Sequence, residues 1–171
     1  AVPLVRGEPY YQSYLIVNKK NAIKSLEGLR GKTFAFTDPD SNTGTLVPNY
    51  WVAMKGETPE SFFKETTYTY SHDNSIIAVA KSLVDGAAVD SHIWEYYHRI
   101  NPEYTANTQI IKKSVPFGSP PFVSSKSLPQ VLKDKIQDIL MTMHLDPKGK
   151  HIQSSLFIDK FVLPQESWYQ H

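Results

Sequence analysis

The sequence contains no cysteine. Disulfide bonds, thiol catalysis and thiolate metal sites are therefore excluded. No apolar run approaches the roughly twenty residues that a membrane-spanning helix needs. The first residues, Ala1–Leu4, lack the basic and apolar regions of a signal peptide. We therefore expect that a leader was removed or that the chain was cut from a longer one.

Clustered positive charge is also scarce. The formal net charge is +1, and the densest basic clusters are Lys19–Lys20 and Lys112–Lys113. A basic face for nucleic acid is therefore not expected. Internal repeats and low-complexity tracts are missing as well. Hydrophobic residues make up 40% of the chain, which is enough apolar material for a folded core.

Apolar periodicity predicts strands that alternate with helices over the first two thirds of the chain. This order is typical of an α/β fold with a mainly parallel sheet flanked by helices. The predicted strands are 14–17, 33–37, 67–70, 87–89 and 109–111, and the predicted helices are 45–55, 76–84 and 91–100.

The composition changes at the Pro- and Gly-rich segment 116–121, which no regular element accommodates. Beyond it, one amphipathic helix is predicted, followed by a shorter helix that begins near Pro147. The apolar stripe of the first helix consists of Val131, Ile136, Ile139, Leu140 and Met143.

Polar residues collect directly after three predicted strands, at 38–45, 71–75 and 90–92. In open α/β sheets, ligands bind beyond the carboxyl ends of the strands, where helices begin. Candidate binding residues are therefore expected in these three loops.

The first loop has the composition of an oxyanion site. Ser41 and Thr43 offer hydroxyl donors, Gly44 allows close approach of the backbone, and a helix N-terminus adds partial positive charge. The alternative is that Ser41, Asn42 or Thr43 caps the following helix. The carboxylates of Asp38 and Asp40 would have to turn away from an anion.

His72 and Asp90 in the other two loops each have two interpretations. His72 is either a donor to an anion or a solvated loop histidine, and Asp90 is either a helix cap or a ligand contact. A hydrolase that uses Ser41, His72 and Asp90 is a remote third reading, because no G-x-S-x-G motif surrounds Ser41. The pairs His92/His98 and His144/His151 do not share a helical face, so no metal site and no cofactor are expected.

Three segments together resemble the phosphonate-binding proteins of bacterial ABC importers. Residues 38–48, D-P-D-S-N-T-G-T-L-V-P, are similar to that family's D-P-N-S-T-S-G-x-L-V-P signature. Residues 11–19 resemble the family's crossover strand. Residues 71–80 are similar to its G-H-x-x-x-x-A-L-A-V-A segment.

The resemblance implies a type II periplasmic binding protein, whose two lobes close around a ligand. It implies a hinge or crossover strand at 1–18, an α/β ligand-binding lobe at 19–115, and a return segment at 116–171 whose helices belong to the other lobe. The family's phosphonate contacts match Tyr11, Ser41, Asn42, Thr43 and His72, with Asn42 retaining only its backbone N–H for this role.

Two departures from the family pattern affect the expected function. The carboxylates with which the family binds a ligand's amino group align with His92 and Pro120 of this sequence. Phosphate, phosphite or an alkyl phosphonate is therefore expected to fit better than an aminoalkyl phosphonate, unless Asp90 substitutes for these carboxylates. About one lobe of sequence before Tyr11 is missing, so we expect the chain to self-associate or to bind its ligand weakly. The resemblance implies a periplasmic or extracytoplasmic location, with an ABC transporter permease as the partner. Alternatively, this domain would be the extracellular sensor of a membrane-bound signalling protein.

Overall fold

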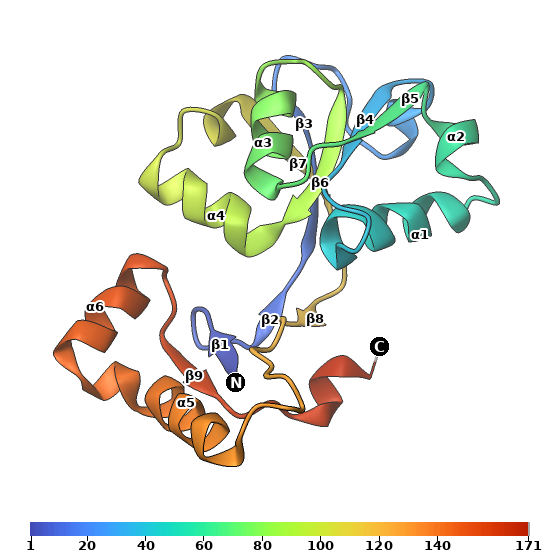
Figure 1. Cartoon of the computed structure of the whole chain (residues 1–171). Helices are drawn as coiled ribbons and strands as arrows, with labels where there is room; N and C mark the ends of the chain where they lie inside the picture. Colours follow the sequence, from blue (N-terminus) through green and yellow to red (C-terminus); the bar gives the residue numbers. More distant parts are fainter. Residues whose placement is uncertain (171) are drawn as a thin grey trace. The chain divides into compact units, whose positions relative to one another are not determined.

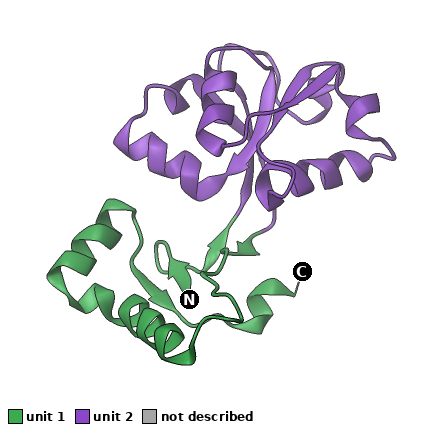
Figure 2. Cartoon of the chain, viewed as in Figure 1, with its two compact units in different colours: residues 1–11, 116–171 green, residues 12–115 purple. Residues whose placement is uncertain are grey.

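The chain forms two compact units in the computed structural model, which describes residues 1–170. Unit 1 consists of Ala1–Tyr11 and the segment from Pro116 onward, and unit 2 is Gln12–Val115 (Figure 2). The chain therefore enters unit 2 after Tyr11 and leaves it after Val115. Residues 12–18, which we had grouped with a crossover segment, lie in unit 2 because their strand pairs on both sides with strands of that unit.

Unit 2 contains a five-stranded sheet with the strand order β5-β4-β6-β3-β7 (Figure 1). Strand β4 is parallel to β5 and β6, whereas β3 is antiparallel to β6 and β7. Four strands thus run one way and β3 opposes them, so the sheet is mainly parallel in direction. The strands are β3 (Ser13–Asn18), β4 (Thr33–Phe36), β5 (Glu65–Tyr68), β6 (Gly86–Asp90) and β7 (Thr108–Lys113).

Helices cover both faces of this sheet. All six residues of β3 are buried, as expected for a strand with cover on each side. Tyr14 and Ile16, which point to the same face of β3, pack with Ile76 and Val79 of α3. In Figure 1, α3 and α4 lie on one side of the sheet, and α1 and α2 on the other. These helices are α1 (Val47–Ala53), α2 (Pro59–Phe62), α3 (His72–Ala80) and α4 (Ser91–Ile100).

The two ends of unit 2 are hydrogen-bonded to each other. The Ser13 N–H donates to the Ser114 hydroxyl at 2.9 Å, and the Ser114 N–H donates to the Ser13 carbonyl at 3.0 Å. Next to them, Tyr14 of β3 pairs with Lys113 of β7. The entry and exit points of this unit are therefore held side by side.

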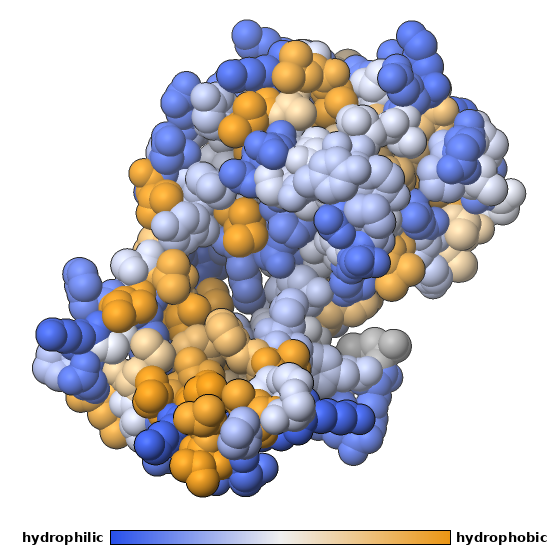
Figure 3. Space-filling view, viewed as in Figure 1, coloured by the Kyte–Doolittle hydropathy of each residue, from blue (hydrophilic) through white to orange (hydrophobic). Residues whose placement is uncertain are grey.

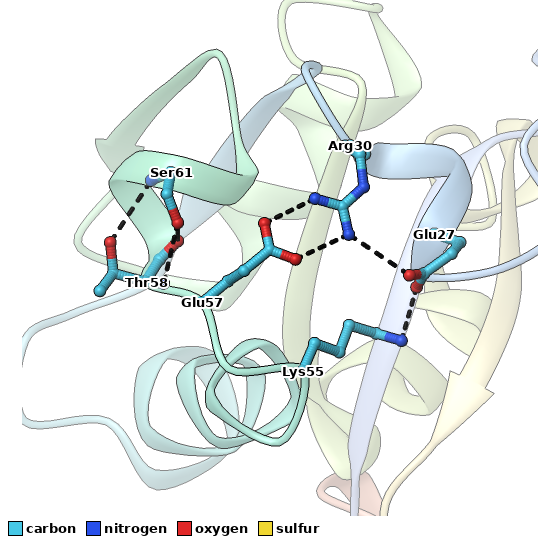
Figure 4. A network of polar contacts seen from close by, with 6 residues as sticks. All are labelled: Glu27, Arg30, Lys55, Glu57, Thr58 and Ser61. Carbon is cyan, nitrogen blue, oxygen red and sulfur yellow. Dashed lines mark hydrogen bonds and ion pairs between the residues drawn. The ribbon is translucent and has the colours of Figure 1, made fainter.

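An ion-pair network lies at the amino end of β4 (Figure 4). Arg30 donates to both carboxylate oxygens of Glu57, at 2.5 and 2.8 Å, and also contacts Glu27. Lys55 completes the network at 2.6 Å from Glu27. Because these side chains are partly solvent-exposed and Arg30 precedes β4, we assign the network a modest structural role, away from the carboxyl ends of the strands.

Unit 1 combines both ends of the chain. Two short antiparallel pairs, β1 with β9 and β2 with β8, join segments that are more than a hundred residues apart in sequence. The helices α5 and α6 confirm the two predicted after the Pro-rich turn. The elements are β1 (Val2–Leu4), β2 (Tyr10–Tyr11), β8 (Phe117–Gly118), α5 (Gln130–Thr142), α6 (Pro147–Ser155) and β9 (Lys160–Val162).

Much of the apolar stripe of α5 is exposed. Helix α5 buries none of its residues; Val131 is 66% exposed and Ile139 62% exposed. Figure 3 shows apolar side chains gathered on the surface of unit 1. A patch of this kind favours association with other chains.

We expect the average mass of the wild-type chain to rise with concentration in analytical ultracentrifugation. Ile139→Lys should reduce this association, because it places a charge in the stripe. The matched control is Leu83→Lys in unit 2, where the side chain is also exposed (71%). A wild-type chain that stays monomeric at every concentration would contradict the prediction.

Candidate functional site

The three polar loops lie at one edge of the sheet in unit 2. Strands β5, β4 and β6 are neighbours and run parallel, so their carboxyl ends meet at that edge. The structure therefore brings the segment after β4, the start of α3 and the end of β6 close together, as predicted from the loop composition.

The segment after β4 forms a π-helical turn, Asn42–Leu46, that continues directly into α1. The predicted helix 45–55 therefore begins three residues earlier than expected. Such turns are rare and occur often at functional sites. The Ser41 hydroxyl accepts a hydrogen bond from the Gly44 N–H at 3.0 Å, which confirms the capping role. Because this bond uses a lone pair, the Ser41 O–H still has a proton to donate.

Thr43 occupies the second position of the turn and is only 2% exposed. Its carbonyl accepts a hydrogen bond from the Ser13 hydroxyl at 2.6 Å, which ties the turn to the start of β3. At this position the turn itself supplies no acceptor for the backbone N–H. Thr43 thus presents an amide and a hydroxyl that could bind an anion.

Gly44 packs against Thr37, the residue that follows β4. A Cβ atom at position 44 would fall on the Thr37 side chain. The Thr37 N–H also donates to the Gly44 carbonyl at 3.3 Å. The sequence interpretation gave Gly44 the role of admitting a ligand, whereas in this structure the close approach that it permits is to Thr37.

His72 is the first residue of α3 and is partly buried, so it is not the freely solvated loop histidine of our alternative. Its Nδ1 accepts a hydrogen bond from the Asp90 N–H at 3.1 Å. An amide can only donate, so the proton of the neutral ring resides on Nε2. Burial lowers the pKa of His72, against the opposing charges of Asp90 and Asp73. His72 is therefore a neutral Nε2–H donor.

Asp90 caps α4. Its carboxylate accepts hydrogen bonds from the His92 N–H at 2.7 Å and the Ile93 N–H at 3.3 Å. The capping interpretation is confirmed. In a Ser–His–Asp triad the carboxylate accepts a hydrogen bond from the Nδ1–H of the histidine, whereas here the Asp90 backbone N–H donates to Nδ1 of His72. This arrangement is not that of the remote hydrolase reading.

Tyr11, the remaining candidate, ends strand β2 in unit 1 and is buried. Its ring contacts Phe117 edge to face, with the centroids 6.3 Å apart. Its role toward a ligand stays a prediction.

Sequence reasoning assigned no role to Thr37 or Ser13. Thr37 is 3% exposed, and its side chain reaches both His72 and the Ala88 carbonyl. The available signal was a hydroxyl residue that directly follows a buried strand and precedes the polar loop.

Between residues 1 and 170, no group of three His, Asp or Glu side chains is arranged to hold a metal ion. Over the same range, no helix combines the length and the apolar character needed to cross a membrane.

Comparisons with known proteins identify the family of the chain. The family described as "ABC transporter, phosphonate, periplasmic substrate-binding protein" matches residues 1–169. The phosphonates-binding periplasmic protein of Escherichia coli (strain K12) is 35% identical over 154 residues, which are 88% of this chain and 45% of that protein. The chain thus spans less than half of that relative's length.

Solved structures show the same fold. The binding component of an ABC phosphonate transporter from Pseudomonas aeruginosa superposes with a TM-score of 0.89 at 30% identity, covering 98% of this chain and 57% of that one. A protein from Prochlorococcus marinus (MIT 9301), solved in complex with methylphosphonate, has a TM-score of 0.83 at 20% identity, covering 99% and 66%. Since the family match extends over nearly the whole sequence, the chain belongs to the periplasmic substrate-binding proteins of phosphonate ABC transporters.

Proposed function

We propose that this chain binds a small tetrahedral oxyanion, of the phosphonate, phosphite or phosphate type, for delivery to an ABC importer. Binding would take place outside the cytoplasm and would leave the ligand chemically unchanged. Membership of the family supports this role. The observation that carries it is the meeting of the Ser41–Gly44 turn and the neutral His72 donor at one edge of the sheet.

The donors at this edge suit a phosphonate head group. Ser41 and Thr43 contribute hydroxyls, the start of the turn contributes backbone N–H groups, and His72 contributes Nε2–H. Hydrogen bonds to an anion from such uncharged donors can replace its hydration without a lysine or arginine. The carboxylate of Asp90 is occupied with the α4 amides, which limits its repulsion of an anion.

The ligand's other end is proposed to lack an amino group. His92 and Pro120 stand where the family pattern has carboxylates, and neither pairs with an ammonium group. Ethylphosphonate should therefore bind at least as tightly as 2-aminoethylphosphonate in calorimetric titrations. A clear preference for the amine would contradict this ligand class.

Thr43→Val tests the oxyanion site directly. The substitution keeps the shape of the side chain and removes its hydroxyl, so methylphosphonate affinity should fall about tenfold. Isothermal titration calorimetry would measure the change. The control, Thr66→Val on the exposed strand β5, should bind like the wild type. Equal affinities for both variants would leave Thr43 with a structural role only.

A further inference from the structure

Thr37 is hydrogen-bonded to all three segments that form the proposed site. Its N–H donates to the Gly44 carbonyl, and its carbonyl accepts from the Tyr70 N–H at 2.6 Å. Its hydroxyl lies 3.2 Å from the Ala88 carbonyl on β6 and 3.3 Å from Nδ1 of His72. Through its backbone and its nearly buried side chain, this one residue thus contacts all three segments.

The surroundings of His72 Nδ1 determine what the other ring nitrogen can do. Two groups face Nδ1: the Asp90 amide, which can only donate, and the Thr37 hydroxyl, whose one proton is shared between Nδ1 and the Ala88 carbonyl. Protonation at Nδ1 would break the bond from Asp90. The ring is thereby held with its proton on Nε2, and its orientation is fixed by two contacts.

The same side chain limits the position of the oxyanion turn. Since the Cα of Gly44 rests against Thr37, a shift of the turn toward β4 would collide with the Thr37 side chain. Thr37 therefore limits the position of both the turn and the His72 ring. That residue has no need to touch the ligand.

We infer that Thr37 is a positioning residue, which holds His72 as the Nε2–H donor and sets its distance from the Ser41–Gly44 turn. The expected effect of Thr37 on ligand affinity rests on the proposed function. The expected effect on the His72 tautomer does not depend on any ligand.

The test compares Thr37→Val, which removes the hydroxyl, with Thr37→Ser, which keeps it. In ¹⁵N NMR spectra of the ligand-free chain at neutral pH, wild type and Thr37→Ser should show a single Nε2–H form of His72. Thr37→Val should show a second ring state, and its affinity for methylphosphonate should fall about tenfold. Thr37→Ser should recover most of that affinity.

Thr33→Val is the matched control at the other end of β4. The Thr33 hydroxyl is also hydrogen-bonded, to Asp85, so its loss should reduce stability without altering the His72 signals. A Thr37→Val protein with wild-type His72 signals and affinity would overturn the inference. If that variant does not fold, the wild-type spectrum still decides, because an Nδ1–H or cationic ring would exclude the proposed arrangement. A wild-type chain that shows the expected tautomer but does not bind methylphosphonate would refute the proposed function alone.

Discussion

Gly44→Ala should reduce the free energy of unfolding by about 3 kcal/mol and abolish measurable methylphosphonate binding. The added methyl group would overlap the Thr37 side chain and come within 3.0 Å of the Ser41 hydroxyl oxygen. Overpacking of this kind displaces backbone, because neither neighbour is a flexible chain end. The displaced backbone belongs to the turn that is proposed to hold the anion. Urea denaturation and calorimetric titration would measure the two effects.

Gly28→Ala provides the control for backbone and entropy effects of alanine. Gly28 lies in a 3-10 turn that precedes β4, and a Cβ at this position would meet only Ile23, with its methyl group nearest at 3.1 Å. That variant should stay within about 1 kcal/mol of the wild type and bind normally. Equal losses in the two variants would show that contact with Thr37 is not the cause.

Acidification should destabilise the chain through His72. Burial lowers its folded-state pKa below the ordinary histidine value of about 6.5. Below that pH the histidine is protonated in the unfolded chain but not in the folded chain. The free energy of unfolding therefore falls with decreasing pH until the folded-state pKa is reached. For one group the slope can approach about 1.4 kcal/mol per pH unit. Urea denaturation series between pH 7.5 and 5 would measure it.

His72→Gln should remove this component of the pH dependence. The charged or titratable groups around the ring are Asp90, Asp73 and Tyr97, which contacts Asp73. All three remain in the variant. The difference between the two stability curves therefore isolates the histidine. A wild-type curve that declines no faster than that of His72→Gln would mean that folding does not lower the pKa of His72.

Most helices and strands of unit 2 could be predicted from the sequence, because the apolar pattern of each one lies within its own short segment. Strand β3 is an unbroken buried run, and α4 was predicted with its observed bounds. The short strands of unit 1 were missed, since β1 and β2 owe their conformation to partners more than a hundred residues away. Helix α2 was also missed, because four residues with a capping box leave no periodicity to detect.

The candidate site was predictable in composition but not in its hydrogen bonding. The hydroxyls and glycine of the first loop identify an anion-binding turn from their residue types. Whether Nδ1 of His72 donates or accepts depends on the Asp90 amide, which is 18 residues away along the chain. The signal from Thr37, a hydroxyl residue between a buried strand and the polar loop, was not specific, because threonine is common in strands for its β propensity.

The paired hydrogen bonds between Ser13 and Ser114 have a consequence for the order of folding. Unit 1 is assembled from two pieces that a stretch of about 100 residues separates, and closing a flexible loop of that length costs about 3 kcal/mol more than closing a tight turn. Once unit 2 has folded, its ends are already adjacent, and the entropy of that closure no longer opposes the pairing of β2 with β8. Unit 2 then acts as an intramolecular template, and unit 1 completes its strands in a second, local step.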